Sequence, residues 1–246
     1  MGRHQAVKFS RRDPKSARGH SRHIGSVTGT RSVRFFEEQF RRQEAAKEFA
    51  LNPFEARALP FVGGSVLDLG CGLGNLAIAA AAKGARVFAL DASDTAIKSL
   101  AARATDLHLA IATQRVDLRD YIPEGEYDAV VSIGLFMFFP CDAARRQLKR
   151  ALRAVRPGGT VVVNVLIEGT TYMEMFDTER GYCLLGQDEL PLALAGWEML
   201  DTTVSSSLMR LPAPSSGSEL RSHGDQGIRL KLHGLRQDRL RSRAGP

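Results

Sequence analysis

The stretch Asp68–Asn75 has the pattern Asp-x-Gly-x-Gly-x-Gly-Asn, with glycines at 70, 72 and 74. Glycines at alternate positions allow a tight turn and let a ligand lie against bare main chain. The carboxylate of Asp68, two residues ahead of the first glycine, would repel a pyrophosphate but suits a ligand that carries an ammonium and a sulfonium. Asn75 occupies the sixth position from Gly70, where the dinucleotide fingerprint has glycine. The pattern therefore predicts a loop for a cationic small molecule, with a turn that serves only packing as the alternative.

Two further carboxylates follow predicted strands. Asp91 ends the apolar stretch 86–90 and lies 21 residues beyond Gly70, where α/β nucleotide sites have the carboxylate that binds ribose hydroxyls. Asp117 follows the predicted strand 109–116 in the same way. Because ligands of parallel sheets bind at the carboxyl ends of the strands, we expect both acids to face one ligand. Taken singly, each could instead cap a helix or a turn.

An apolar run and an irregular segment are the candidates for the walls of a second pocket. Residues 135–139 read Leu-Phe-Met-Phe-Phe in a strand-exit loop, where exposed apolar side chains are costly, so they predict a pocket wall, with plain packing as the alternative. Residues 167–186 follow another strand and are expected to fold over the site as a substrate lid. The pocket candidates are apolar residues, two tyrosines and one cation that could hold an anion: Met137, Phe138, Tyr172, Met173, Phe176, Tyr182 and Arg180.

Strands and helices alternate along the chain, which predicts an α/β fold with a doubly wound, mostly parallel sheet. In this fold the loops and acids named above gather at one edge of the sheet. The predicted strands are 66–69, 86–91, 109–116, 127–133, 160–166 and a last one from 196 onward. The predicted helices are 32–51, 75–83, 92–105, 141–155 and 187–195. The pair Asn52-Pro53 is expected to end the first helix.

Composition divides the chain into a domain, 32–212, and two basic arms, 1–31 and 213–246. The formal net charge is +7, yet residues 1–34 carry nine Lys/Arg against one acid, and residues 35–209 carry seventeen against twenty-three. The arms lack a hydrophobic period and are predicted to be disordered. Only 228–232 in the second arm reads as a strand. The arms leave nucleic acid as a less favoured partner beside a small-molecule acceptor.

The motifs together resemble those of class I S-adenosylmethionine (SAM)-dependent methyltransferases, and among these the tellurite-resistance, TehB-like group. The resemblance covers residues 32–205. It rests on Asp68–Asn75, Asp91, Asp117-Leu118, the run 135–139, Arg156–Gly159 and Gly196-Trp197-Glu198. It is specific for SAM and methyl transfer and much less specific for the acceptor.

The resemblance implies a Rossmann-like fold, SAM as cofactor and an N-terminal helix that closes over it, with Phe36 and Phe40 as lid candidates. Such folds end in an antiparallel hairpin whose last strand inserts into the sheet, for which 228–232 is the candidate. The residues that the resemblance assigns to SAM follow from the motifs: Asp68, Gly70, Cys71, Gly72, Gly74, Asn75, Asp91, Ala92, Asp117, Leu118 and Ile133.

Residue usage also bounds the chemistry and the compartment. Three cysteines without a C-x-x-C pair indicate neither a disulfide framework nor a zinc site, and we expect no metal. The basic N-terminus lacks a following apolar segment and no run is long enough to span a membrane, so a cytoplasmic protein is expected. The pattern does not specify an oligomeric state.

The acceptor is expected to be a soft nucleophile. Methyl transfer needs a general base only when the acceptor must lose a proton. Between 35 and 209 the single histidine is His108, placed away from the strand ends where the site should form. Thiolates and selenium or tellurium oxyanions need no base. Two alternatives stay open: an RNA methyltransferase that uses its basic arms, and a SAM- or nucleotide-binding module without turnover.

Overall fold

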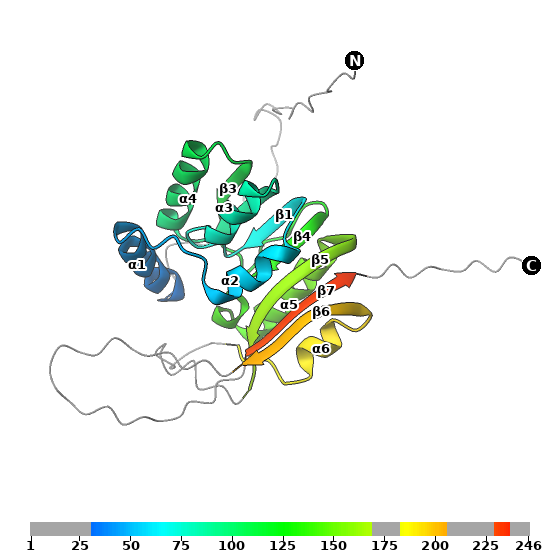
Figure 1. Cartoon of the computed structure of the whole chain (residues 1–246). Helices are drawn as coiled ribbons and strands as arrows, with labels where there is room; N and C mark the ends of the chain where they lie inside the picture. Colours follow the sequence, from blue (N-terminus) through cyan, green and yellow to red (C-terminus); the bar gives the residue numbers. More distant parts are fainter. Residues whose placement is uncertain (1–30, 169–182, 206–228, 237–246) are drawn as a thin grey trace, which may run out of the picture.

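The computed structural model describes residues 31–168, 183–205 and 229–236 (Figure 1). The helices are α1 (Arg31–Ala45), α2 (Pro53–Ala58), α3 (Asn75–Ala82), α4 (Asp94–Asp106), α5 (Cys141–Arg153) and α6 (Glu189–Ala193), with 3-10 turns η1 (Leu59–Phe61) and η2 (Phe136–Phe138). The strands are β1 (Ser65–Leu69), β2 (Arg86–Asp91), β3 (Ile111–Arg115), β4 (Tyr127–Ser132), β5 (Val155–Leu166), β6 (Trp197–Ser205) and β7 (Arg229–Arg236).

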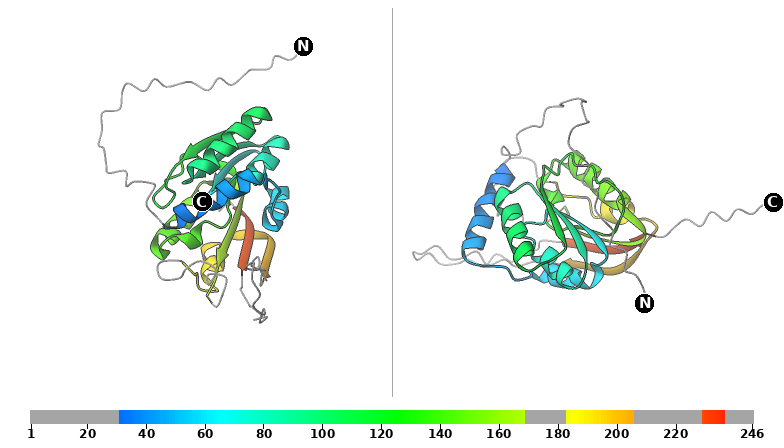
Figure 2. Two further views of the ribbon diagram at one scale, coloured as in Figure 1. Left: turned by 90° about the vertical axis from the view of Figure 1, so that its left-hand side faces the viewer. Right: turned by 90° about the horizontal axis from the view of Figure 1, so that it is seen from above.

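The strands form one seven-stranded sheet in the order β3-β2-β1-β4-β5-β7-β6. The first five strands in this order are parallel, whereas β7 is antiparallel to both β5 and β6. Helices cover the sheet on both faces (Figure 2). The predicted α/β fold with a doubly wound, mostly parallel sheet and an N-terminal helix is therefore confirmed.

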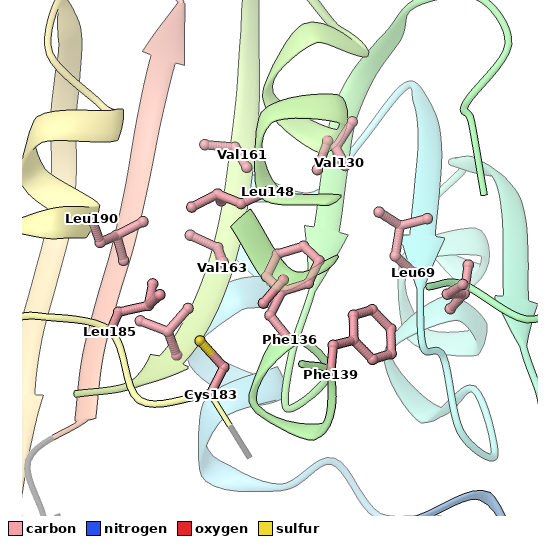
Figure 3. Close-up of a cluster of buried hydrophobic side chains, with 14 of the residues drawn as sticks. Leu69, Val130, Phe136, Phe139, Leu148, Val161, Val163, Cys183, Leu185 and Leu190 are labelled. Atoms are coloured by element: carbon pink, nitrogen blue, oxygen red, sulfur yellow. The ribbon is translucent and has the colours of Figure 1, made fainter. Parts of the chain in front are cut away.

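Neighbouring residues of the central strands enter two different cores because side chains alternate across a sheet. In β1, Leu67 packs with α5 and α6 in the larger core, part of which Figure 3 shows. Val66 packs on the opposite face with the alanines of α3 and with Leu100 of α4. Val130 and Val131 of β4 divide in the same way. Burial on both faces is why these strands read as continuous apolar runs.

The N-terminal helix is shorter than the sequence predicted, and a second helix follows it. The Asn52 side chain accepts hydrogen bonds from the backbone N–H groups of Phe54 and Glu55, both at 2.9 Å. The Glu55 carboxylate accepts in return from the Asn52 backbone N–H at 2.8 Å. This capping box starts α2, with Pro53 at the first helical position. The expectation of one helix over 32–51 ended by Asn52-Pro53 is thus wrong, because Asn52 begins a helix.

At the amino edge of the sheet, Asp128 joins the starts of β1 and β4 to the turn before the paired part of β5. Its carboxylate accepts from the Ser65 backbone N–H at 2.7 Å and from the Ser65 hydroxyl at 2.8 Å, and it pairs with Arg156. Residues 156–159 bulge out between the pairs Tyr127–Val155 and Ala129–Thr160. Gly159 lies in this bulge because a Cβ there would meet the Asp128 carbonyl oxygen at 2.8 Å.

The strand β7 comes from the segment that composition set apart as a basic tail. It lies between β5 and β6 and pairs with β5 from Thr160–Leu235 to Leu166–Arg229. The sheet therefore extends beyond residue 212, and the candidate strand 228–232 supplies the inserted strand of the terminal hairpin. Without it, β6 would have no neighbour in the sheet order.

Removal of β7 should therefore unfold the β5 side of the sheet. We expect a chain truncated after residue 228 to lose a cooperative thermal transition, because β5 and β6 would lose their shared ladder partner. A chain truncated after residue 236 keeps β7 and is the matched control, with an unchanged Tm. Circular dichroism melts of both chains test this, and equal Tm values would contradict it.

Candidate functional site

The glycine loop lies at the carboxyl edge of the sheet, between β1 and α3. The backbone N–H groups of Gly70 and Cys71 both donate to the Leu90 carbonyl oxygen, at 2.8 and 3.0 Å. Gly70, Gly72 and Gly74 have φ of 75°, 53° and 72°, a region that favours glycine. The exit of β1 is thus tied to the end of the neighbouring strand β2.

A Cβ added to each loop glycine would meet a different neighbour. At Gly74 it would lie 2.4 Å from Leu100 of α4, so this glycine allows close helix packing. At Gly70 it would lie 3.0 Å from Leu135, which follows β4. At Gly72 the nearest atom is Cζ of Phe40 in α1, at 3.1 Å. Gly72 is thus where the loop main chain faces the N-terminal helix.

Asp91 holds the glycine loop from the end of β2. Its carboxylate accepts from the Gly72 backbone N–H at 2.9 Å and from the Ser93 backbone N–H at 2.8 Å. Burial raises its pKa, and the charge of Glu37 adds to this, while the backbone hydrogen bonds act in the opposite direction. A buried carboxylate bonded to the loop is placed to bind hydroxyl groups beside it.

Asp68 is the most deeply buried acid of the loop region, with 5% of its surface exposed. Burial raises its pKa to about 7, and the charges of Glu55 and Asp91 contribute to the rise. The site therefore disfavours a second negative charge and would stabilise a cation. This agrees with a ligand that carries an ammonium and a sulfonium.

The other residues predicted for SAM lie around this loop, and their contacts differ. The Asn75 side chain donates to the Ala50 carbonyl oxygen at 3.1 Å and accepts from Arg103 at 3.3 Å, so it holds the chain before α2. The carbonyl oxygen of Ala92 accepts from Arg115. Leu118 is buried and Ile133 packs against the core that contains α3. Cys71 is buried beside Asp91 and Asp68, which together with burial raise the pKa of its thiol.

Asp117 reaches the same edge but is engaged by its neighbour. The Val116 backbone N–H donates to the Asp91 carbonyl oxygen at 2.9 Å, which brings the exits of β3 and β2 together. The Asp117 carboxylate accepts from the Arg119 backbone N–H at 3.0 Å and from its guanidinium. The Arg119 side chain lowers the pKa of Asp117. A ligand amino group at Asp117 would therefore have to share this carboxylate with Arg119.

The helix α1 covers the site through Phe36 and Glu37. Phe36 was predicted as a lid residue, whereas Glu37 was not predicted. Its carboxylate accepts from the hydroxyls of Ser93 and Thr95, both at 2.6 Å. Burial raises the pKa of Glu37, but these hydrogen bonds and the charge of Arg41 outweigh burial and lower it overall. Phe36, a predicted lid residue, packs edge-on against Phe138 with ring centroids 4.8 Å apart. A charged side chain on an otherwise aromatic helix face was the available signal for Glu37.

Of the residues predicted to line the acceptor pocket, the structure describes Met137 and Phe138. Met137 is buried and packs with Leu166, while the half-buried Phe138 packs against them. The Cys183 backbone N–H donates to the Met137 carbonyl oxygen at 3.0 Å. Nearby, Ser132 at the end of β4 is buried, and its hydroxyl forms no hydrogen bond within the described part of the chain. The remaining pocket candidates lie outside the described residues: Tyr172, Met173, Phe176, Arg180 and Tyr182.

The cysteine count did not indicate a disulfide framework, yet Cys141 and Cys183 form a disulfide with Cα atoms 4.7 Å apart. The prediction missed this pair because the two residues are 42 positions apart and meet only through the fold. Cys71 is free. Among the described residues no group of three potential ligands could hold a metal ion, and none of their helices is long and apolar enough to cross a bilayer.

Comparison with known proteins finds similarity in the central part of the chain. Residues 66–159 match a family described as "Methyltransferase domain". The chain is 29% identical over 153 residues to a ubiquinone biosynthesis O-methyltransferase from Thiobacillus denitrificans, which covers 58% of this chain and 65% of the relative. It is 35% identical over 106 residues to the protein of that name from Sodalis glossinidius, covering 42% of each. The chain thus spans less than two thirds of these relatives.

Solved structures share the fold over a longer stretch. TehB from Haemophilus influenzae superposes with a TM-score of 0.63 and 17% identity, covering 82% of this chain and 67% of that one. A magnesium protoporphyrin IX methyltransferase from Synechocystis with bound SAH superposes with a TM-score of 0.54 and 15% identity, covering 86% of this chain and 91% of that one. A third structure concerns the conversion of a disulfide bond into a thioacetal group during echinomycin biosynthesis. It superposes with a TM-score of 0.53 and 27% identity, covering 76% of this chain and 82% of that one.

The described residues fit SAM. Gly72 presents main chain without a side chain, and any Cβ there would take up space beneath Phe40. Burial disfavours the charged forms of Asp68 and Asp91, and a cationic ligand such as SAM would favour them. SAM is the cofactor that this arrangement and this domain type share.

The raised pKa of Asp68 makes SAM affinity depend on pH. Below about 7 the free protein holds a proton on Asp68 that an ammonium would displace, so affinity should rise with pH up to about 7 and then level off. Calorimetry from pH 5.5 to 8.5, in buffers of different ionisation enthalpy, measures both affinity and proton release. Asp68→Asn should bind more weakly, without this pH dependence. A flat profile for the unmodified chain would contradict the assignment.

Stability provides a second check on Asp68. Because its folded pKa lies above the usual value of 3.8, the folded state binds the proton more tightly than the unfolded chain. The contribution of Asp68 to the free energy of unfolding is complete below about pH 4, and it is lost as the pH rises to about 7. Asp68→Asn should therefore raise Tm at pH 8 and have little effect at pH 4.

Asp91→Ala should weaken SAM binding by about 2 kcal/mol, roughly thirtyfold, because charge-assisted hydrogen bonds to the ligand and to Gly72 are lost. Asp94→Ala is the matched control, since Asp94 lies three residues away and pairs with Lys98 on the surface. Isothermal titration with SAM should separate the two variants. Equal affinities would exclude Asp91 from the site.

Proposed function

Taking residues 66–159 as a SAM-dependent methyltransferase domain of class I, we propose that this chain transfers the methyl group of SAM to a small-molecule acceptor. The observation that carries the proposal is the half-buried carboxylate of Asp91, bonded to Gly72, together with the buried Asp68. A glycine turn that served only packing would not need two buried acids, which are costly without a cationic partner. The activity of the whole chain and its acceptor are both part of the proposal.

Bound SAM supplies an electrophilic methyl group on a sulfonium. In our proposal Asp91 holds the ribose and Asp68 the ammonium, so acids from two neighbouring strands orient the cofactor. Met137 and Phe138 form an apolar wall at the adjacent strand exit, which excludes water from the acceptor. Such an arrangement acts by alignment and by water exclusion, which are the main demands of a methyl transfer.

We further propose a soft nucleophile as acceptor, a thiolate or a selenium or tellurium oxyanion, and with it the TehB-like grouping. Two histidines fall in the described part of the chain, and neither is at the site edge. His108 lies in the turn after α4, and His233 pairs with Val162 in mid-strand. Asp91 and Asp117 are engaged in hydrogen bonds. The structure concerned with conversion of a disulfide into a thioacetal supports sulfur chemistry on this fold.

A phenolic oxygen is the second candidate. It is favoured by the relatives described as ubiquinone biosynthesis O-methyltransferases, which match about half of this chain. A phenol must lose its proton before or during transfer, whereas a thiolate is already a nucleophile at neutral pH. The two classes of acceptor therefore differ in their dependence on a base. The RNA acceptor and the binding module without turnover are further outcomes of the same experiment.

A methyl-transfer screen with labelled SAM tests the proposal over thiols, selenite and tellurite, phenols, and RNA. We expect label in the thiol or chalcogen products, at rates that follow pocket fit and the ionisation of the acceptor itself. Gly72→Val is the control, because a side chain on the loop should remove SAM binding and all transfer with it. Transfer only to phenols or RNA would overturn the soft-nucleophile proposal, and SAM binding without transfer to any of them would favour the module.

A further inference from the structure

The two bonded cysteines differ in exposure. Cys183 is buried with 2% of its surface exposed, whereas Cys141 is partly exposed at the start of α5. Cys141 is therefore the one of the two that a small thiol or disulfide in solution would meet first. Figure 3 shows Cys183 among the buried side chains near Phe136 and Leu185.

The position of Cys141 also favours its reactive form. It is the first residue of a thirteen-residue helix, where free backbone N–H groups and the helix dipole stabilise a negative charge. Asp142 follows in the same turn and Arg145 pairs with Glu189, so the helix end is the group that favours the Cys141 thiolate. Cys141 thus combines access with a setting that stabilises the thiolate, the form that takes part in disulfide exchange.

The third cysteine has the opposite properties. Cys71 is buried and free, and burial together with Asp91 and Asp68 raises the pKa of its thiol well above the usual value. It should remain an unreactive thiol at neutral pH. The chain thus contains its own internal control for cysteine chemistry.

The disulfide holds together residues of the predicted acceptor wall. Cys183 donates its backbone N–H to the Met137 carbonyl oxygen at 3.0 Å, and Leu184 packs against Met137 and Leu166. The next residue, Leu185, donates its backbone N–H to the Leu166 carbonyl oxygen at 3.0 Å. Cys141 follows η2 by three residues. The crosslink therefore joins the segment 183–185 to the chain that follows the turn carrying Met137 and Phe138.

From these contacts we infer that Cys141 and Cys183 form a reversible thiol–disulfide exchange site that reacts with small disulfides. The Cys141 thiolate attacks one sulfur of the small disulfide, forms a mixed disulfide and releases the first thiolate. Cys183 then loses its proton to solvent and attacks the Cys141 sulfur, which releases the second thiolate. Two cysteines are oxidised and one small disulfide is reduced to two thiols. Excess small thiol reverses both steps.

The consequence for methyl transfer rests on the proposed function. In the oxidised chain the segment 183–185 is fixed against Met137, so the wall is assembled. Reduction removes the covalent restraint but leaves the glycine loop unchanged. We therefore expect reduction to raise KM for the acceptor several-fold with little change in the Kd for SAM.

Trapping experiments on the full-length chain test the chemistry without any methyl acceptor. Reduced Cys183→Ser, mixed with glutathione disulfide under native conditions, should form one glutathione adduct at Cys141, located by intact mass and peptide mapping. Cys141→Ser should form none, because Cys183 is buried. The unmodified chain should end as an intramolecular disulfide with one free thiol, that of Cys71. Equal labelling of both variants, or three free thiols after oxidation, would overturn the inference.

A thermal measurement provides a second readout. Reduction of the unmodified chain should lower Tm by on the order of 5–10 °C, because the crosslink closes a long loop. Cys141→Ser should have the lower Tm with or without reductant. A failed acceptor screen with successful trapping would count against the methyl-transfer proposal alone. An unchanged Tm on reduction would show that the disulfide does not restrain the fold. It would overturn the inference that the disulfide fixes the segment 183–185 against Met137.

Discussion

The hydrogen bond from the Gly72 backbone N–H to the Asp91 carboxylate is the constraint on which the site depends. It joins the loop after β1 to the end of β2, which the Leu90 carbonyl oxygen already ties to Gly70 and Cys71. A loop with three positive φ angles would otherwise have many conformations, and Gly72 has no side chain to restrict it. The half-buried Asp91 carboxylate that holds the loop is also the group that we propose for the ribose hydroxyls.

From Gly72 a series of aromatic contacts leads to Phe138 in the proposed acceptor wall. Phe40 lies above Gly72, Phe36 stacks on Phe40 with ring centroids 5.8 Å apart, and Phe138 meets Phe36 edge-on. All of these contacts pass through α1, which Glu37 fastens to the start of α4. Cofactor loop and acceptor wall are therefore in contact through one helix, although they follow different strands. A ligand on the main chain at Gly72 would lie next to the Phe40 ring.

The sequence predicted those parts of the fold that local patterns determine. Strands buried on both faces, such as Val66–Leu69 and Val130–Val131, read as apolar runs. Asp91 and Asp117 lie at the carboxyl ends of β2 and β3, at the expected edge. The capping signal Asn52-Pro53-Phe54-Glu55 was present but was read as a stop. The pairing of Cys141 with Cys183, and the insertion of β7, depend on residues far apart in the chain. Glu37 was missed because its partners Ser93 and Thr95 are more than fifty residues away.

Asp128 at the amino edge of the sheet and the pair Asp68 and Asp91 at the carboxyl edge have pKa values shifted in opposite directions. At the amino edge, hydrogen bonds from Ser65 and the pair with Arg156 lower the pKa of Asp128 to about 2. This group stabilises the fold above its unfolded pKa, and that contribution is lost only as pH falls toward 2. At the carboxyl edge burial raises the pKa values of Asp68 and Asp91, so their charged forms destabilise the fold near neutral pH. Burial thus opposes the charged forms of Asp68 and Asp91 in the protein alone, and a cationic ligand would favour them.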